Sequence, residues 1–465
     1  MKIYAPVTEA VLDALKTIVG AEYVLTEPEK LEQYQTDEET DPRKFHLPEA
    51  VVLPKDAQEI AAVIKLANTY DVPVTVRSGG TSLAGGAIPV CGGIVLLMER
   101  LNKIIELNAE GMYMEVEAGV RTVDIQKYAN EAGFLYAGDP CSAESCLIGG
   151  NIATNAGGNK AVRYGTTRDQ VYAIEAVTPT GDIVNVGARL KKKSTGYCLE
   201  QLIMGSEGTL GIITKATLKL LPLCPYKLDL LAIFTDLDKA VGLVPNLIKA
   251  GLNPTSVEFM DNAFVRSSSD YCELKLPHYE DGFYVIVTVE TFNEDELESK
   301  MEQLDEICSA SGATDVLEAD DRVWKLRRNC LESTRVLSLV STSDDLVVPV
   351  DQIANCIRHL TRVAENYNFK LFTLAHAGDG NLHFQILKGE MSDEQWEDEV
   401  SRFHAEAYPY VYSLGGRLSG EHGIGAKKVE AMEKYTEPVE MKMMREIKRA
   451  LDPKNILNPG KVFNA

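Results

Sequence analysis

The sequence lacks a long apolar segment, because none of its hydrophobic runs approaches the roughly 18 residues that a transmembrane helix needs. A secretory signal is also missing, since Glu9 and Asp13 interrupt the apolar stretch from Val7 to Val19. Basic residues are scarce: 47 lysines and arginines stand against 69 aspartates and glutamates, for a formal net charge of −22. Nucleic acids and anionic membrane surfaces attract basic patches, so this charge argues against both as partners. We therefore expect a cytoplasmic protein.

Paired cysteines are missing as well. The nine cysteines are odd in number and form no C-x-x-C pair, which excludes a regular disulfide framework and an iron–sulfur motif. We expect buried thiols instead. No G-x-G-x-x-G follows an expected strand and no P-loop occurs, so the fingerprints for nicotinamide dinucleotides and for nucleoside triphosphates are both absent.

What the sequence does contain is a glycine-rich loop, residues 77–86, directly after the β-branched run Val74–Val76. Four glycines in ten residues remove Cβ atoms that would block a close backbone approach. Successive N–H groups in such a loop can converge on phosphate oxygens, while Arg77 adds charge and Thr81 and Ser82 add hydroxyl donors. A tight structural turn explains one such loop equally well.

A second loop of the same kind, residues 149–158, again combines glycines with hydroxyl and amide side chains. Two loops of this composition favour a long cofactor that carries a diphosphate over two unrelated turns.

The length of 465 residues predicts two or three domains. We expect an α+β fold with an N-terminal helical arm (1–45), a cofactor domain that carries both glycine loops (46–222), a substrate or cap domain (223–445) and a C-terminal tail (446–465). The cap domain begins with strands and helices in the order β-α-β-β-α-β, the ferredoxin-like arrangement, at 228–235, 236–251, 255–259, 283–291, 295–310 and 314–318.

The segment 376–383 carries two histidines around an Asp-Gly dipeptide, which is a strong signal for a two-residue hairpin turn. With the turn centred on Asp379-Gly380, His376 lies directly opposite His383, with the two Cβ atoms about 4.5–5.5 Å apart. Two imidazoles so placed could chelate one divalent metal. An ordinary hairpin with two histidines is the alternative.

The segment 419–425 places Glu421 and His422 between glycines. Glu421 could complete a set of two imidazoles and one carboxylate with open positions, which suits zinc, iron(II) or manganese. His422 would then serve as a base, although a turn or capping cluster explains these residues as well. Arg327, on an expected amphipathic helix, could hold a carboxylate with two hydrogen bonds, while a solvated helix face is the commoner explanation.

Seven ordered motifs make the chain recognisable: Arg77-Ser-Gly-Gly-Thr-Ser, the 150–158 loop, Gly205-Ser-Glu-Gly-Thr-Leu-Gly, Trp324-x-x-Arg327, the 376–383 segment, Gly420-Glu-His-Gly and Asn458-Pro-Gly-Lys. Together they resemble the FAD-linked oxidases of the vanillyl-alcohol-oxidase fold, in the branch of D-2-hydroxyacid dehydrogenases that includes D-lactate dehydrogenase and the glycolate oxidase D subunit. The resemblance implies FAD along the first domain, a cap domain over the isoalloxazine, and a tail that returns to the flavin domain.

The resemblance also implies roles for single residues. It assigns His376, His383 and Glu421 as metal ligands, His422 as the base and Arg327 as the partner of the substrate carboxylate. Thr81 stands where many relatives carry a histidine bonded to flavin, so FAD is expected to bind non-covalently. The expected cofactor-binding residues are Arg77, Ser78, Gly79, Gly80, Thr81, Ser82, Gly150, Thr154, Asn155, Gly158, Glu207, Ile212 and Asn458.

The sequence therefore predicts an FAD-dependent dehydrogenase that oxidises a small D-2-hydroxy acid. Relatives that resemble this chain and are specific for 2-hydroxyglutarate hold the distal carboxylate with a threonine and a lysine. Here the first position corresponds to Leu331 and the second falls near Ser343, so D-lactate is favoured. We expect the electrons to pass to a separate electron-transferring flavoprotein. Glycolate or D-2-hydroxyglutarate with another acceptor, a metal-dependent hydrolase and a non-catalytic flavin scaffold are the alternatives; the hydrolase leaves the glycine loops without a role, and the scaffold leaves the histidines without one.

Overall fold

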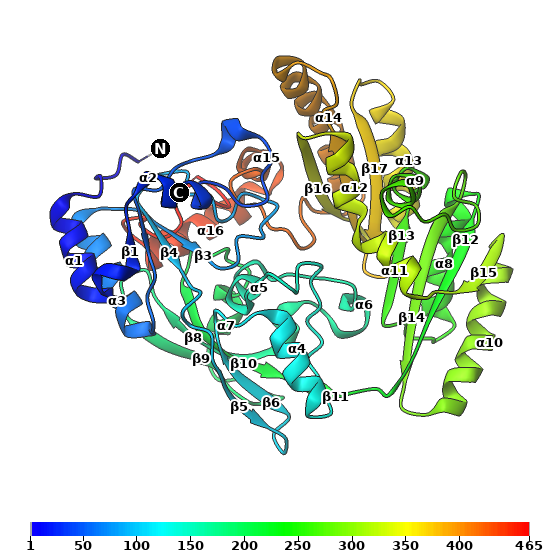
Figure 1. Cartoon of the computed structure of the whole chain (residues 1–465), viewed down its shortest axis with the longest axis horizontal. Helices are drawn as coiled ribbons and strands as arrows, with labels where there is room; N and C mark the ends of the chain where they lie inside the picture. The colour runs from blue at the N-terminus through cyan, green and yellow to red at the C-terminus, as the bar shows by residue number, and fades with distance from the viewer. Residues whose placement is uncertain (1, 465) are drawn as a thin grey trace. The chain divides into compact units, whose positions relative to one another are not determined.

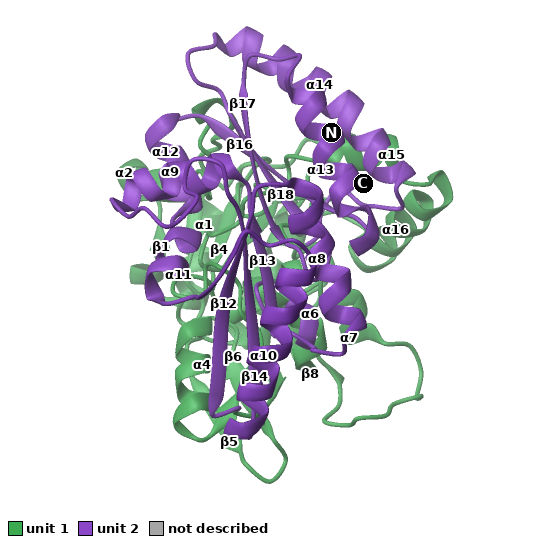
Figure 2. Ribbon diagram, turned by 90° about the vertical axis from the view of Figure 1, so that its right-hand side faces the viewer, with its two compact units in different colours: residues 1–157, 166–223, 421–465 green, residues 158–165, 224–420 purple. Residues whose placement is uncertain are grey.

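A computed structural model describes residues 2–464 and divides the chain into two compact units (Figure 2). Unit 1 comprises residues 1–157, 166–223 and 421–465, and unit 2 comprises residues 158–165 and 224–420. The domain limits expected from the sequence lie at 222/223 and 445/446. In the structure the chain passes from unit 1 to unit 2 after Leu223 and back again after Gly420.

Unit 1 contains a sheet of four strands in the order β1-β2-β4-β3, and the pairs β2–β4 and β3–β4 are parallel. Helix α3 packs into this unit because its apolar stripe, which includes Ile60 and Ile64, is fully buried. Asp56 begins the helix by accepting a hydrogen bond from Glu59 N at 2.9 Å. The elements are α1 (Glu9–Val19), β1 (Val24–Leu25), α2 (Pro28–Leu31), β2 (Ala50–Val52), α3 (Ala57–Tyr70), β3 (Val74–Arg77) and β4 (Ile94–Leu97).

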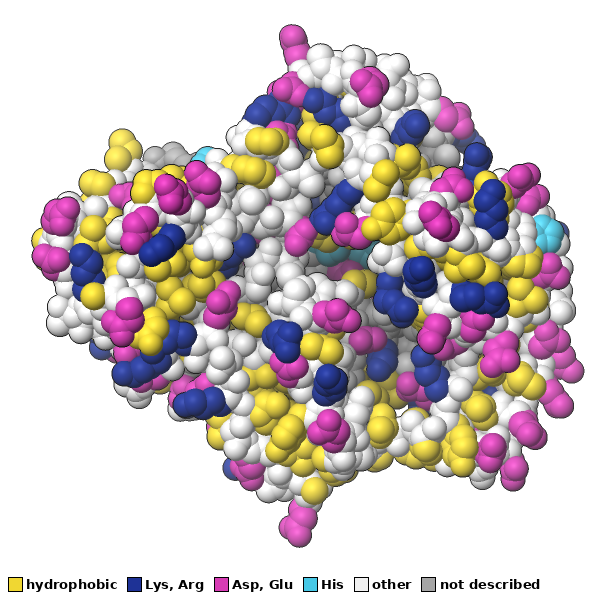
Figure 3. Space-filling view, viewed as in Figure 1, with side chains coloured by type: hydrophobic (Ala, Val, Ile, Leu, Met, Phe, Trp, Pro, Cys, Tyr) yellow, Lys and Arg dark blue, Asp and Glu magenta, His cyan; other side chains and the backbone are white. Residues whose placement is uncertain are grey.

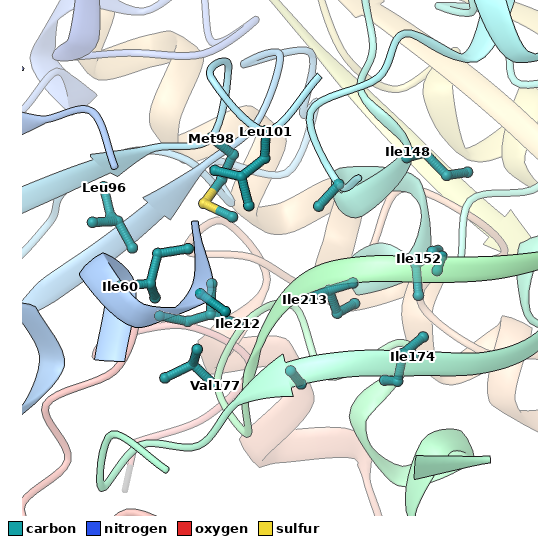
Figure 4. Close-up of a cluster of buried hydrophobic side chains, with 14 of the residues drawn as sticks. Ile60, Leu96, Met98, Leu101, Ile148, Ile152, Ile174, Val177, Ile212 and Ile213 are labelled. Carbon is teal, nitrogen blue, oxygen red and sulfur yellow. The ribbon is translucent and has the colours of Figure 1, made fainter. Parts of the chain in front are cut away.

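A second sheet of unit 1 is antiparallel, with strand order β5-β6-β10-β8-β9. Figure 4 shows how side chains from both sheets and from α3 and α5 form one apolar core, including Ile60, Leu96, Ile152, Val177 and Ile212. Burying each such side chain contributes about 1.5–3 kcal/mol, so this core fixes the positions of the loops above it. The strands are β5 (Ile104–Asn108), β6 (Tyr113–Glu117), β8 (Val171–Val177), β9 (Ile183–Gly187) and β10 (Ile212–Lys219).

The C-terminal tail lies beside β3, the strand that leads into the first glycine loop. Val74 N donates to Ile456 O at 2.9 Å, and Asn458 N donates to Val74 O at 2.7 Å. The remaining elements of unit 1 are α4 (Thr122–Glu131), β7 (Phe134–Leu135), α5 (Ile148–Thr154), α7 (Leu199–Ile203), β11 (Leu221–Pro222), α15 (Val429–Tyr435) and α16 (Pro438–Leu451).

Unit 2 is built on a sheet of seven strands in the order β15-β12-β14-β13-β17-β18-β16, antiparallel at every described pairing (Figure 1). Its first four strands follow the ferredoxin-like order, as the sequence predicts. The elements are α6 (Ala161–Tyr164), β12 (Tyr226–Phe234), α8 (Leu237–Lys249), β13 (Ser256–Met260), α9 (Asn262–Cys272), β14 (Phe283–Thr291), α10 (Glu294–Ala310), β15 (Asp315–Glu318), α11 (Asp321–Arg328), α12 (Cys330–Leu337), β16 (Ser341–Val347), α13 (Ile353–Ala364), β17 (Lys370–His376), β18 (Asn381–Leu387) and α14 (Asp393–Ser413).

Helix α9 is an addition that the sequence analysis does not anticipate. It contributes Phe264 and Val265 to an apolar cluster that also contains Leu326 of α11 and Leu374 of β17. This cluster holds α11, and therefore Arg327, against one face of the sheet.

The N-terminal segment is less helical than expected, since only α1 and the short α2 form α-helices there and β1 joins the first sheet. No disulfide joins the nine cysteines, all of which lie in the described part of the chain, and four of them are buried. Acidic side chains are spread over the face shown in Figure 3, with lysines and arginines between them. Within residues 2–464, no helix has both the length and the apolar character that crossing a bilayer demands.

Candidate functional site

The first glycine loop presents a run of backbone donors. Among the described residues, none accepts a hydrogen bond from the N–H groups of Gly79, Gly80, Thr81 or Ser82. The second half of the loop is stabilised by hydrogen bonds within the loop, because Ser82 Oγ accepts from Ala84 N at 3.2 Å and from Gly86 N at 3.0 Å. Gly80 has a φ of +69°, which glycine adopts without strain. Four adjacent donors suit the oxygens of a diphosphate.

Arg77 braces this loop. Its Nη1 donates to Thr36 O at 2.6 Å, and its guanidinium lies where a Cβ on Gly80 would otherwise be. Burial lowers the pKa of Arg77, while Asp37 opposes that effect. Any side chain larger than hydrogen at position 80 would therefore displace the arginine.

The second glycine loop contacts the first. A Cβ on Gly150 would lie 3.0 Å from Ser78 Cβ, so the glycine permits the two loops to approach. Thr154 Oγ1 donates to Gly150 O at 3.1 Å within α5, and Asn155, with a φ of +54°, ends that helix. Gly158, the last residue predicted for this loop, begins the short segment 158–165 of unit 2.

Glu207 has a role that the sequence analysis does not predict. Its carboxylate is buried and accepts hydrogen bonds from Ile424 N and Gly425 N, both at 2.7 Å. Its backbone carbonyl accepts from Asn458 Nδ2 at 2.6 Å. Burial raises the pKa of Glu207, and the two backbone N–H groups oppose that rise. Glu207 therefore connects the tail with the segment that directly follows His422, and a contact with adenosine stays a prediction.

A further observation in unit 1 fits a large cofactor such as FAD. The buried polar atoms Tyr136 OH, Ser206 Oγ and Asn458 Oδ1 have no hydrogen-bond partner among the described residues. Leaving a buried polar group unsatisfied costs about 1–3 kcal/mol, which a ligand with hydroxyl, amide and phosphate groups can recover. Ile212 begins β10 with its side chain in the core.

Unit 2 holds the two predicted histidines on neighbouring strands, but the predicted register is wrong. His376 pairs with Asn381, and His383 pairs with Leu374. The turn contains four residues because Asp379 N donates to His376 O at 3.2 Å and Asp379 Oδ1 accepts from Asn381 N at 3.0 Å. The histidines are thus diagonal neighbours on one face of the sheet, and their ring centroids are still 5.2 Å apart.

Both histidines are buried, and His376 has a defined orientation. Its Nδ1 lies 2.8 Å from Glu258 Oε1, and Glu258 stands directly opposite it on β13. Because Nδ1 engages a carboxylate, coordination of a metal would use Nε2. Two imidazoles in this geometry fit a divalent ion such as zinc, iron(II) or manganese.

Arg327 reaches the same carboxylate. Its Nε and Nη2 donate to Glu258 Oε2 at 3.1 and 2.7 Å, and both side chains are almost fully buried. Burial alone would raise the pKa of Glu258, but His376 and Arg327 outweigh it and hold that pKa below its ordinary value. The binding of a substrate carboxylate by Arg327 stays a prediction.

Asp345 on β16 anchors the segment that precedes Glu421. It is fully buried and accepts from Asn381 Nδ2 at 2.6 Å, Ser419 Oγ at 2.5 Å and Gly420 N at 3.1 Å. His383 Nδ1 lies 3.8 Å from the same carboxylate. The chain enters unit 1 at the next residue, Glu421.

Within unit 1, Glu421 and His422 are partly buried neighbours. His422 Nε2 lies 3.7 Å from Glu421 Oε1, and the Glu421 carboxylate lies against Gly157, where a Cβ would be 2.6 Å from Oε2. The glycine of the second loop therefore makes room for a predicted metal ligand.

Sequence reasoning missed Glu258 and Asp345. A signal for Glu258 was present, since a glutamate in the middle of the buried strand Ser256–Met260 requires a partner. That partner could not be named because Arg327 and His376 lie 69 and 118 residues away. The sequence carries no comparable signal for Asp345, which is one of two adjacent aspartates, Asp344 and Asp345.

Known proteins resemble this chain along almost its entire length. A model for the FAD binding domain matches residues 48–187, and a model for the C-terminal domain of FAD linked oxidases matches residues 227–462. The chain is 35% identical to D-lactate dehydrogenase of Anaerostipes hadrus, over 99% of this chain and 98% of that protein. It is 35% identical to glycolate oxidase subunit GlcD of Bacillus subtilis (strain 168), over 91% and 90%.

A solved structure of p-cresol methylhydroxylase with substrate bound has a similar fold. Its TM-score is 0.81 at 19% identity, covering 98% of both chains.

Proposed function

Because the chain belongs to the family of FAD-linked oxidases and is an FAD-dependent oxidoreductase of the vanillyl-alcohol-oxidase fold, we propose that it oxidises a small D-2-hydroxy acid to the 2-oxo acid. The observation that carries this proposal is the buried set of His376, Glu258 and Arg327. In this set, an imidazole suited to a metal and a guanidinium suited to a carboxylate both bond to the carboxylate of Glu258. A 2-hydroxy acid offers the two matching groups, a hydroxyl and a carboxylate, on adjacent carbons.

Each residue has a defined task in this proposal. Arg327 binds the substrate carboxylate through charge-assisted hydrogen bonds. His376, His383 and Glu421 would hold a divalent ion, which would lower the pKa of the substrate hydroxyl. An imidazole nitrogen of His422 takes the hydroxyl proton. The two glycine loops would hold FAD non-covalently, and FAD would supply the hydride acceptor for C2 of the substrate.

D-lactate is the favoured substrate. Leu331 of α12 and Ser343 of β16, both half-buried, offer no cation at the two positions that hold a distal carboxylate in the 2-hydroxyglutarate enzymes this chain resembles. Burying an unpaired carboxylate is costly, so a monocarboxylate suits these positions better. Glycolate and D-2-hydroxyglutarate remain the alternative substrates.

We also propose an electron-transferring flavoprotein as the acceptor. The sequence contains neither a nicotinamide fingerprint nor a C-x-x-C motif, and the branch of the family that it resembles includes dehydrogenases working with such a partner. The partner would bring a second flavin within electron-transfer distance of the first.

Anaerobic reduction of the flavin by a panel of D- and L-2-hydroxy acids tests the substrate. D-lactate should bleach the flavin faster than glycolate or D-2-hydroxyglutarate, and the L-enantiomer should react far more slowly. A flavin that none of these acids reduces would contradict the proposal. Reoxidation by electron-transferring flavoprotein, compared with NAD and oxygen, tests the acceptor, and rapid reoxidation by NAD alone would contradict that part.

A further inference from the structure

We propose that Glu258 is a positioning residue that holds the metal-binding face of His376 and the carboxylate-binding arginine Arg327 at one fixed separation. This inference rests on the proposed function for the roles of those two side chains. Glu258 would touch neither substrate nor cofactor, and it would act by orienting residues that do. A single buried carboxylate would thereby match the protein to the spacing between the hydroxyl and carboxylate of the substrate.

The geometry assigns one carboxylate oxygen to each partner. Oε1 lies 2.8 Å from His376 Nδ1, while Oε2 accepts from Arg327 Nη2 at 2.7 Å and from Nε at 3.1 Å. The guanidinium and the imidazole are therefore held on opposite oxygens of one planar group. Neither can rotate without losing a charge-assisted hydrogen bond.

The surroundings leave Glu258 no other role in the sheet. On β14 the residue directly opposite is Ile286, which is fully buried, and two positions along β13 stands Met260, also fully buried. On the same face of β13, two positions the other way, Ser256 is buried and its Oγ donates to Thr288 Oγ1 at 3.0 Å rather than to Glu258. Within residues 2–464, the side chains that bond to the Glu258 carboxylate are Arg327 and His376, the two that it orients.

The bond to His376 also selects the tautomer of the ring. When Nδ1–H donates to Glu258, the lone pair lies on Nε2, which is the form that a metal binds. Carboxylates that support metal-binding histidines in this way typically contribute about 10–100-fold to metal affinity. We expect a contribution of that size from Glu258.

Glu258→Gln is the main test, because the amide keeps the shape of the side chain but turns one acceptor into a donor. The flavin spectrum should show FAD retained, since the glycine loops belong to unit 1. The dissociation constant for Zn²⁺ or Mn²⁺, measured on the metal-depleted protein by competition with a chromophoric chelator, should rise about 10–100-fold. The KM for D-lactate should rise as well, because Arg327 loses its anchor.

Asp261→Asn is the matched control. Asp261 follows β13 by one residue, and it accepts hydrogen bonds from the backbone N–H groups of Phe264 at 2.8 Å and Thr373 at 2.6 Å. Neutralising it should lower thermal stability and leave the metal dissociation constant within about twofold. Equal weakening of metal binding in both variants would reduce Glu258 to a general structural role and overturn the inference.

Two measurements keep the inference testable when Glu258→Gln does not fold. Glu258→Asp keeps the charge but is one methylene too short to reach both partners, and it should weaken metal binding and raise KM in the same way. In the wild-type protein without metal, the ¹⁵N spectrum of His376, assigned by its loss in His376→Gln, should show the Nδ1–H tautomer. The opposite tautomer, or wild-type metal affinity and KM in either folded variant, would overturn the inference.

These readouts also separate this inference from the proposed function. If no 2-hydroxy acid reduces the wild-type flavin, the proposed function fails, while the tautomer of His376 and the metal affinity of the variants still decide the role of Glu258. If D-lactate reduces the wild type and Glu258→Gln behaves identically in every measurement, the proposed function stands and the role of Glu258 is refuted.

Discussion

Unit 1 and unit 2 each contain a buried glutamate with a different kind of partner. Glu258 of unit 2 binds two side chains, Arg327 and His376, whereas Glu207 of unit 1 binds two backbone N–H groups. The pKa of Glu258 lies below its ordinary value because Arg327 and His376 outweigh burial, and the pKa of Glu207 lies above it because two backbone N–H groups do not.

The difference shows what a buried carboxylate can do in each place. A side-chain partner can be oriented for chemistry, so Glu258 acts on functional groups directly. A backbone partner fixes a loop, so Glu207 acts on the course of residues 423–425, next to His422. Glu258 thus orients side chains in unit 2, whereas Glu207 fixes a loop in unit 1, and substitutions in each unit test this contrast.

The largest effect is expected from removing His383, a proposed metal ligand in unit 2. His383→Ala, or treatment with a chelator, should abolish flavin reduction by substrate, because the hydroxyl pKa is no longer lowered. FAD should stay bound, since its loops belong to the other unit. Visible absorbance and elemental analysis measure both outcomes. Full activity in protein shown to contain no metal would exclude a catalytic metal.

Removing His422, the proposed base, from the loop of unit 1 should have the next largest effect. His422→Ala should keep FAD and metal but slow anaerobic flavin reduction by roughly a hundredfold or more, the usual scale for the loss of a general base. Stopped-flow absorbance measures the rate. A rate close to that of the wild type would remove His422 from the mechanism.

Glu207→Gln should have a smaller effect on the same loop. The amide can accept only one of the two backbone hydrogen bonds, and the loss of a hydrogen bond to a charged group costs about 1.5–3 kcal/mol. We expect the thermal midpoint, followed by flavin fluorescence, to fall by several degrees, with metal affinity unchanged. A metal affinity lowered as far as in Glu258→Gln would break the comparison between the two glutamates.

The smallest effect is a change in the pH dependence of stability. Because the pKa of Glu207 is raised from 4.5, the folded chain keeps a proton that the unfolded chain releases as the pH rises above that value. Stability should therefore fall as the pH rises from about 4.5 through the raised pKa. Glu207→Gln should lose this component, which denaturant unfolding at several pH values would reveal. Parallel curves for both proteins would contradict the assignment.

Some features of the fold and the site could be predicted from the sequence, because they depend on residues close together in the chain. The glycines of the first loop and the Asp56 cap of α3 depend on residue types at short separations, and the structure contains both. The β-α-β-β-α-β elements are also present, with α9 inserted between β13 and β14. The histidine hairpin was only partly within reach. Its two strands were expected, but Asp379 uses its own carboxylate to cap Asn381 N, and this lengthens the turn and shifts the register.

By itself, the sequence determined which chemistry-bearing residues exist and which local elements carry them, because capping, glycine turns and strand alternation act over a few residues. The tertiary structure alone decided that Glu258 binds both Arg327 and His376, and that Glu207 holds the backbone at Ile424 and Gly425. Those contacts join residues 69 to 218 positions apart. Only the packing of whole strands and helices brings such residues together. Burial makes an unpaired carboxylate costly, so a partner is required, but a local sequence pattern does not specify which residue that partner is.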